Sequence, residues 1–368
     1  MKKQVINLNI IISLIIFFII SILSIYTTIP FLKQSLSNLY LKQIIFYFFG
    51  ILIMLFIKYK GFDLLKKYHF LVYIGLNILL LFLLIFGYSI NGSKCWIIIG
   101  PFSFQPSELM KISLIITLSM VIKKHEGKNS LKEEFVLLVK LFILTLIPSI
   151  LTFLEPDTGA VIIYFLILLT MIFLTKLNKK WYLIISLIII FLLSCITILY
   201  FLKKDFILNI LTNNMYRLER IINWQENSGY QLENSLIAIS NSGLTGFGYN
   251  KNIIYFPEPQ TDFIFPTFVA NFGLLGSIFL IFIILVFDAT ILNLIKIKID
   301  LENKYILVGI FIMLFYLQVQ NIGMTLGLLP ITGIPLPFIS YGGSSLITYL
   351  FSLGIILNIN KTRDKYLN

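Results

Sequence analysis

Ten apolar segments, each close to the length of a bilayer-spanning helix, constrain this 368-residue chain more than any other feature of its sequence. A membrane helix needs about 20 consecutive, mostly apolar residues. The chain is 58% hydrophobic and 12% charged, whereas soluble domains run nearer to about 45–50% apolar and about 25% charged. We therefore predict an all-α integral membrane protein with ten transmembrane helices, folded as a single domain over residues 1–368. The segments cover approximately residues 7–29, 41–58, 69–88, 106–123, 135–154, 159–175, 181–202, 263–293, 305–328 and 340–360.

The first segment is expected to remain in the mature protein. Lys2 and Lys3 precede an apolar run that continues to Ile29, which is longer than the core of a secretory signal and has no A-x-A-like cleavage site. Cys95 and Cys195 are the only cysteines, so the sequence carries no disulfide framework.

Basic residues are distributed unevenly between the loops on the two sides of a membrane crossed by the ten predicted helices. Nineteen of the 29 Lys and Arg residues lie in the two tails and in the connections on the same side as the tails. The positive-inside rule places that side, with both termini, in the cytoplasm. The net charge of +12 is therefore a sign of topology, and we expect no nucleic-acid partner. The location predicted is a membrane that faces the cytoplasm on this lysine-rich side and is crossed many times.

This orientation places one long loop, about residues 203–262, outside the cell between the seventh and eighth helices. A connection of that length in a compact protein indicates a function. Within it, Leu232, Leu236 and Ile239 recur at helical spacing, which predicts a short helix lying on the membrane surface.

Asp262 ends the outer loop in the run Phe256-Pro257-Glu258-Pro259-Gln260-Thr261-Asp262-Phe263-Ile264-Phe265, where water gives way to hydrocarbon. A carboxylate at that depth is costly in free energy, so its presence indicates a structural or functional role. One interpretation is an N-cap, with Thr261 or Asp262 accepting from the first amides of the next helix. The other is a general base, kept ionised by the helix N-terminus. The two interpretations are compatible.

A second stretch, Gln105-Pro106-Ser107-Glu108-Leu109-Met110-Lys111, begins the fourth apolar segment. Pro106 suits the first helical position, and Glu108 is favourable in the first turn. Lys111 lies deeper, about 7 Å along the helix at 1.5 Å per residue. Residues three apart share a face, so Glu108 and Lys111 are expected to pair inside the bundle, where charges usually mark function.

Three further outer stretches carry polar residues. Glu155-Pro156-Asp157 is either the polar tip of a helical hairpin or a site for a sugar hydroxyl or a cation. Arg217 and Arg220 either anchor the loop to lipid headgroups or hold a phosphate through the planar guanidinium. Prolines and glycines from Gly327 to Gly343 imply an irregular backbone that lines a cavity or is buried in protein.

Taken together, these stretches resemble the SEDS family (shape, elongation, division and sporulation), which includes FtsW, RodA and SpoVE. The similarity extends in order from about residue 91 to residue 345. It rests on the combination of Gln105-Pro106-Ser107-Glu108, Pro156-Asp157, Thr261-Asp262-Phe263-Ile264-Phe265 and Ser340-Tyr341-Gly342-Gly343-Ser344.

The resemblance implies a peptidoglycan glycosyltransferase that polymerises lipid II, an undecaprenyl-pyrophosphate-linked disaccharide pentapeptide, with a class B penicillin-binding protein as transpeptidase partner. Asp262 matches the family's essential acid, and we assign it the role of general base. No cofactor is demanded, and a divalent cation, Mg²⁺ or Mn²⁺, is left open. The residues expected to bind substrate are Glu108, Lys111, Asp157, Arg217, Arg220, Gln231 and Ser344.

The chain departs from the family pattern at three places. Ala270-Asn271 stands where the family usually has Glu-Glu, Cys95 where it commonly has arginine, and Glu155 where glutamine is usual. Within the family, Gly229-Tyr230-Gln231-Leu232 is closer to FtsW than to RodA.

Two other functions remain open from the sequence. A lipid II flippase would also have broken helices and buried charges, but it needs a path reachable from both faces, and the polar signals cluster on one. A non-catalytic scaffold for a penicillin-binding protein would leave the outer acids and arginines without a chemical task.

Overall fold

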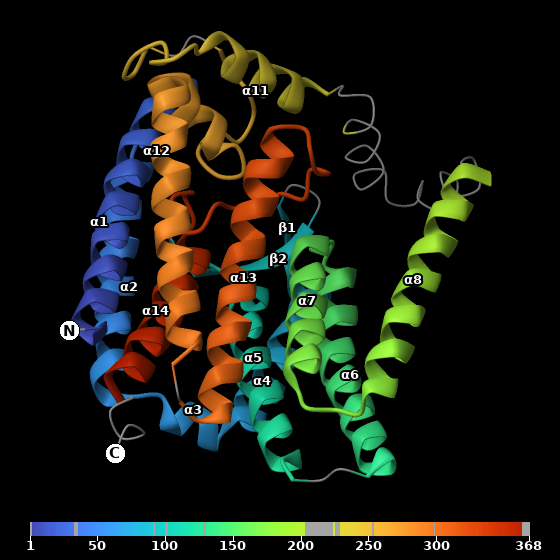
Figure 1. The fold of residues 1–368 in the computed structure, drawn as a ribbon. Helices are drawn as coiled ribbons and strands as arrows, with labels where there is room; N and C mark the ends of the chain where they lie inside the picture. Colours follow the sequence, from blue (N-terminus) through green and yellow to red (C-terminus); the bar gives the residue numbers. More distant parts are fainter. Residues whose placement is uncertain are drawn as a thin grey trace.

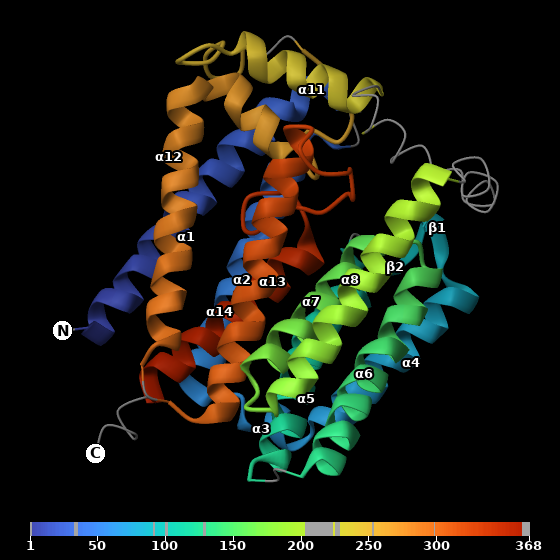
Figure 2. The same ribbon diagram turned by 45° about the vertical axis from the view of Figure 1, so that its right-hand side comes forward.

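The structure is a computed structural model that describes residues 2–32, 36–90, 93–99, 102–127, 130–202, 224, 229–251, 254–297 and 299–362. It is a bundle of long helices that run roughly side by side, with a shorter helix lying across one end (Figures 1 and 2). Arg217 and Arg220 lie outside the described residues, so their predicted roles stay predictions.

Each of the ten predicted segments coincides with one long helix. The match is close because an apolar run of this length can satisfy its backbone in a bilayer only as a helix. The helices are α1 (Lys2–Thr28), α2 (Leu39–Lys60), α4 (His69–Phe86), α5 (Pro106–His125), α6 (Leu131–Leu154), α7 (Thr158–Leu174), α8 (Lys179–Leu202), α12 (Ile264–Ile295), α13 (Leu301–Thr325) and α14 (Gly343–Thr362).

Among the residues that the structure describes, seven of these helices are long and apolar enough to cross a membrane, and α7 is a shorter apolar helix. The seven are α1, α2, α4, α6, α12, α13 and α14. The start of α1 and the end of α14 both lie toward the end of the bundle away from α11 (Tyr230–Asn241), as Figures 1 and 2 show. That placement agrees with an even number of crossings.

Two helices, α5 and α14, form the centre of the bundle, and most of their residues are buried. Helix α14 packs along α2, where a Cβ on Gly50 would overlap Leu350 and one on Gly354 would come within 2.9 Å of the Met54 carbonyl oxygen. Small residues allow such close approach of membrane helices. Two buried hydroxyls of these helices donate to their own backbone, Ser119 to the Ile116 carbonyl and Ser352 to the Thr348 carbonyl.

The connection from α4 to α5 contains a small sheet that the sequence analysis did not predict. Strands β1 (Tyr88–Ile90), β2 (Ser93–Ile99) and β3 (Phe102–Phe104) pair antiparallel in the order β1-β2-β3. Ile97 is opposite Phe104 in this register, which brings Trp96 on β2 close to the residue that precedes α5. The all-α prediction therefore holds for the long helices and is incomplete in this loop.

Helix α12 is broken at Gly273, whose backbone angles are φ 66° and ψ −161°. The loop around Gly246 lies against the break, because Phe247 N donates to the Ala270 carbonyl (2.8 Å) and Leu274 N to the Gly243 carbonyl (3.0 Å). Amides and carbonyls freed by the break thus find partners in the loop. This contact attaches the outer loop to the bundle.

The helix predicted within the outer loop is present as α11, but its surroundings correct the prediction. Its apolar face packs on α12 and α13, where Leu232 joins a buried cluster with Phe256 and Phe263. Leu236 is packed against the same cluster. The apolar spacing therefore reflects contact with protein, which buries that face as effectively as a membrane surface would.

Two short helical segments complete the described chain. A 3-10 helix covers Ile29–Phe31 after α1, and α3 covers Asp63–Lys67 between α2 and α4. Neither contributes to the site described next.

Candidate active site

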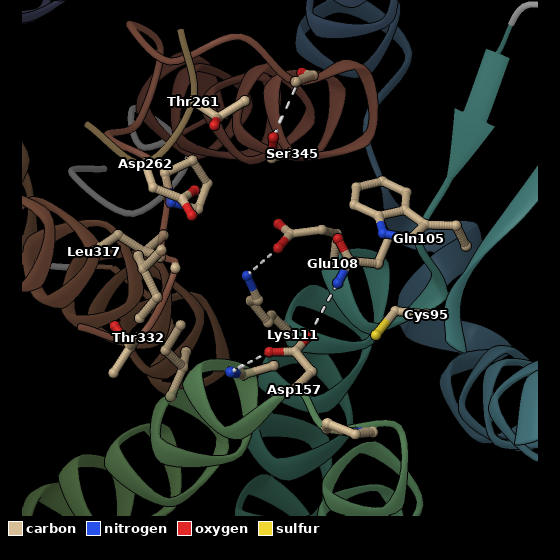
Figure 3. A pocket seen from close by; sticks show the side chains of 18 of the residues that line it. Cys95, Gln105, Glu108, Lys111, Asp157, Thr261, Asp262, Leu317, Thr332 and Ser345 are labelled. Carbon is tan, nitrogen blue, oxygen red and sulfur yellow. Dashed lines mark hydrogen bonds and ion pairs between the residues drawn. The ribbon is translucent and has the colours of Figure 1, made fainter. Parts of the chain in front are cut away.

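A cavity of about 200 Å³ lies at the end of the bundle nearest α11, and four of the stretches singled out in the sequence meet there (Figure 3). Its walls come from β2, the starts of α5, α7 and α14, the turn before α12, the outer part of α13 and the loop that follows α13. The described lining residues are Cys95, Trp96, Gln105, Glu108, Lys111, Pro156, Asp157, Ala160, Ile163, Thr261, Asp262, Leu317, Thr332, Gly333, Ile334, Pro335, Tyr341, Gly342 and Ser345.

Asp262 lies across the cavity from Glu108 and Lys111 (Figure 3). Helix α12 begins at Ile264 with Phe263 at the N-cap position, so Thr261 and Asp262 precede the cap. The interpretation of either residue as the N-cap is therefore wrong. Because Asp262 is only half-buried and lines the cavity, its carboxylate is placed to meet a bound molecule.

The backbone around Asp262 is held by two polar side chains from other elements. Asn321 on α13 is fully buried and donates through Nδ2 to the carbonyls of Asp262 (2.8 Å) and Ile334 (2.7 Å). Ser340 Oγ donates to the Thr261 carbonyl (2.6 Å) and accepts from Leu336 N. These bonds fix the turn to α13 and to the loop that follows it. The sequence signal that could have identified Asn321 is a buried amide in an apolar helix.

Glu108 and Lys111 form the predicted ion pair, with Lys111 Nζ 2.6 Å from Glu108 Oε1. Their side chains are only 7% and 2% exposed, so each charge depends on the other for compensation. The second carboxylate oxygen of Glu108 is buried and has no hydrogen-bond partner among the described residues. That oxygen keeps an acceptor available beside the cavity.

Asp157 has a structural task that accounts for both of its oxygens. Its Oδ1 caps α7 by accepting from Ala160 N (3.0 Å). Its Oδ2 accepts from Gln105 Nε2 and from Ser107 Oγ, both at 3.0 Å. The carboxylate thereby joins the start of α7 to the start of α5, and it also lines the cavity (Figure 3).

Glu155 is the C-cap residue of α6 and is fully buried. Neither carboxylate oxygen has a hydrogen-bond partner among the described residues. Burial, aided by the charge of the neighbouring Asp157, raises the pKa of Glu155 to about 8. The departure from glutamine at this position therefore keeps a largely neutral side chain near pH 7.

Two of the predicted substrate-binding residues hold backbone instead of lining the cavity. Ser344 Oγ accepts from Gln105 N (3.0 Å) and donates to the Ser103 carbonyl (2.9 Å), while the next residue, Ser345, is the one that lines the cavity. Gln231 on α11 donates to the Pro257 carbonyl (3.1 Å). No property of the sequence distinguishes Ser344 from Ser345, because the difference depends on the turn of α14.

The residues that replace the family's Glu-Glu are also structural. Ala270 is fully buried in the cluster under α11. Asn271 donates to Thr27 Oγ1 on α1 (3.2 Å) and accepts from Asn250 N (2.9 Å). Neither lines the cavity. Cys95 does, and its thiol donates to the Glu155 carbonyl (3.0 Å).

Within the described ranges, no three His, Cys, Asp or Glu side chains gather in a way that could hold a metal ion. The only basic side chain among the described lining residues is Lys111, against the carboxylates of Glu108, Asp157 and Asp262. This distribution suits the removal of a proton from a hydroxyl more than the binding of several phosphates.

The fold and this cavity define a multi-pass membrane protein with a charged pocket at one end of a helical bundle. The family whose profile is described as "Cell cycle protein" (FtsW, RodA and SpoVE) matches residues 3–365. The chain therefore belongs to the FtsW/RodA/SpoVE family, the SEDS proteins.

Several relatives agree with this assignment. The chain is 37% identical over 309 residues to the probable peptidoglycan glycosyltransferase FtsW of Wigglesworthia glossinidia brevipalpis, covering 80% of this chain and 76% of the relative. It is 27% identical to the peptidoglycan glycosyltransferase RodA of Treponema pallidum, covering 88% and 90%. Since both types are among the relatives, the closer resemblance to FtsW stays a prediction.

Solved structures share the fold. One chain, from a structure described as "Structural coordination of polymerization and crosslinking by a peptidoglycan synthase complex", has a TM-score of 0.77 and 25% identity, covering 96% of this chain and 97% of that chain. The rod shape determining protein RodA of Thermus thermophilus has a TM-score of 0.69 and 23% identity, with 96% of each chain covered.

Proposed function

We propose that this peptidoglycan glycosyltransferase polymerises lipid II into glycan strands at the outer face of the bacterial cytoplasmic membrane, with Asp262 as the general base. The observation that carries the proposal is the convergence of Asp262, the Glu108–Lys111 pair and Asp157 on one cavity. These residues come from three separate stretches of the sequence, and the packing of the bundle brings them to one cavity.

The reaction is proposed as a single inverting displacement. The acceptor's GlcNAc 4-hydroxyl attacks the anomeric carbon of the donor's MurNAc, a carbon–oxygen bond forms, and the bond to undecaprenyl pyrophosphate breaks. Asp262 takes the proton of the hydroxyl. A base within hydrogen-bond reach typically contributes about 10²–10⁴-fold to such a step.

The leaving pyrophosphate needs positive charge to stabilise it. We assign that role to Lys111 together with Arg217 and Arg220, and the two arginines lie outside the described residues. Lys111 is the one basic side chain among the described lining residues, which supports the need for cations from the outer loop. The described acids do not gather as a ligand set for a divalent cation, and the cations proposed for the pyrophosphate are these three side chains.

The partner proposed is a class B penicillin-binding protein that crosslinks the new strands. The support is a likeness to the chain from a peptidoglycan synthase complex. Neither septal nor lateral wall synthesis is assigned, since relatives of both the FtsW and RodA types match the chain.

The test uses purified protein with its partner and fluorescent lipid II, and it compares the wild type with Asp262→Asn and Asp262→Ala. We expect glycan strands from the wild type and at least a 100-fold loss of rate in both variants, with partner binding and thermal midpoint retained. Polymerisation by Asp262→Asn at the wild-type rate would rule out the general base.

The same assay separates the other two functions. Detergent removes the two-sided membrane, so a flippase has no measurable task there while a polymerase still lengthens strands. A scaffold would give strands only when its partner brings its own polymerase. Addition of a partner that contains only a transpeptidase domain therefore distinguishes the scaffold from the enzyme.

A further inference from the structure

A second cavity, of about 400 Å³, lies at the opposite end of the bundle from the candidate active site. Helix α5 shows this arrangement directly, since Lys111 in its second turn lines the first cavity and Lys123 in its last turn lines the second. The two lysines are twelve positions apart, which corresponds to about 18 Å of helix. We call this second cavity the inner cavity, because it lies on the side predicted to face the cytoplasm.

The walls of the inner cavity are both basic and apolar. Lys123 and His125 come from the end of α5, Lys176 follows α7, and Lys304 comes from the start of α13. The apolar part is formed by Ile122, Leu174 and Leu301. A lining of this kind fits a molecule with an anionic head and an apolar body.

The charges of the inner cavity are only partly compensated by the protein. Lys123 is paired with Glu302, and Glu126 is the acid among the described lining residues. Lys176 and Lys304 are exposed and form no ion pair with a residue that the structure describes. Positive charge therefore remains available at the mouth of the cavity.

His125 provides an independent sign of a missing partner. Its Nε2 is buried and has no hydrogen-bond partner among the described residues. A buried polar atom without a partner costs roughly 1–3 kcal/mol, so such atoms are usually satisfied by protein, by an ordered water or by a bound group. An anionic oxygen beside Lys176 and Lys304 would accept from this nitrogen.

We propose that the inner cavity binds the phosphate of an anionic phospholipid from the adjacent leaflet, with Lys176, Lys304 and His125 as its contacts. The chemistry recognised is a phosphate oxygen, which a free phosphate ion also offers. The apolar walls favour the lipid, because they give its acyl chains a surface that the free ion cannot use. The site is distinct from the one that carries the proposed transferase reaction.

The test counts bound lipid by native mass spectrometry after extraction from vesicles of phosphatidylglycerol in phosphatidylcholine. The variant is Lys176→Gln/Lys304→Gln, and the matched control is Lys132→Gln/Lys180→Gln, which removes two exposed lysines that do not line the cavity. A lysine at the membrane surface contributes about a fivefold affinity for anionic lipid. We therefore expect roughly a 25-fold loss in the first variant and little change in the control.

Three results would overturn the proposal. Equal losses in both variants would show general attraction of the basic face to anionic lipid. Inorganic phosphate that binds as tightly as phosphatidylglycerol, and displaces it, would show that the source is the free ion. A third contrary result is no recovery of binding in Lys176→Arg/Lys304→Arg, which keeps both charges and, like the Gln variant, changes only exposed side chains.

Discussion

At the scale of single residues, the candidate site is a balance of one buried cation and several acids. Among the described residues, Lys111 forms its ion pair with Glu108, at 2.6 Å, whereas Asp157 is satisfied by three hydrogen bonds from the protein. Asp262 is the acid that faces Glu108 and Lys111 across the cavity (Figure 3). The site thus assigns different tasks to acids that look equivalent in the sequence.

The Glu108–Lys111 pair gives a prediction that separates stability from substrate contact. Lys111→Met leaves Glu108 as a buried, unpaired charge, so we expect a loss of about 3–5 kcal/mol in unfolding free energy. In Glu108→Gln/Lys111→Met no charge is left uncompensated, and stability should return to within about 1 kcal/mol. Polymerisation should stay lost in the double variant, since the lysine is proposed to meet pyrophosphate.

Thermal unfolding and the lipid II assay check both halves of this prediction. If the double variant regains both stability and polymerisation, the pair is structural and the contact with substrate is refuted.

Glu155 predicts a dependence of stability on pH. Its pKa is about 8 in the folded protein against 4.5 for a free glutamate, so between these values the folded state binds a proton that the unfolded state releases. Stability should therefore fall as pH rises from about 4.5 to about 8 and level off above, by roughly 5 kcal/mol in all. Glu155→Gln should remove this decline and be the more stable protein at pH 8.

Thermal midpoints measured from pH 5 to pH 9 test this expectation. The control is Glu233→Gln, which alters an exposed acid on α11 and should keep the slope of the wild type. Parallel curves for Glu155→Gln and the wild type would contradict the proposed protonation.

At the scale of elements, the break in α12 matters most, because it joins the outer loop to the bundle just beyond the turn that carries Asp262. Gly273 adopts φ 66° and ψ −161°, a region that is essentially limited to glycine. A Cβ at this position would also overlap the backbone of Gly246 and Leu244. Helix, loop and active-site turn are thus packed as one unit.

The prediction at this scale is that Gly273→Ala lowers the unfolding free energy by about 3 kcal/mol or more, through backbone strain and overlap together. Gly75→Ala on α4 is the matched control, since a Cβ there meets nothing within 4 Å. That change should be neutral or stabilise by up to about 1 kcal/mol. Equal thermal midpoints for the two variants would show that the contact between loop and helix is weak.

At the scale of the whole molecule, the two cavities lie at opposite ends of one bundle, and α5, α7 and α13 extend from one to the other. The first cavity is rich in acids and the second in lysines, in the same sense as the loops, whose lysines lie mostly on the side predicted to face the cytoplasm. The orientation in the membrane therefore decides which ligand each proposed site can meet, lipid II at the outer end and a phospholipid of the inner leaflet at the other.

The orientation predicts which positions a membrane-impermeant maleimide can reach in intact cells. In a Cys95→Ala/Cys195→Ala background, Lys251→Cys near α11 should be labelled from outside. Lys180→Cys at the start of α8 should be labelled only after the membrane is made permeable, because lysine-rich connections stay in the cytoplasm. Both positions are exposed in the structure, and the reverse pattern of labelling would overturn the topology.

The sequence by itself determined the long helices, their limits to within about five residues, and the Glu108–Lys111 contact. These depend on local rules, since an apolar run of about 20 residues must form a helix in a bilayer and residues three apart share a helical face. The family followed from the order of the short motifs, and the family profile over residues 3–365 confirmed it.

Only the tertiary structure decided which polar residues share a cavity. The packing of α5, α7, α13 and the turn before α12 brings together residues more than 200 positions apart, and no local pattern encodes that distance. Packing also turned the apolar face of α11 onto protein, placed Ser345 and not Ser344 at the cavity, and made Asn321 the support of Asp262. The side chains that surround a residue are set by the packing of the whole bundle, whereas the formation of its helix is set by residues close to it in the sequence.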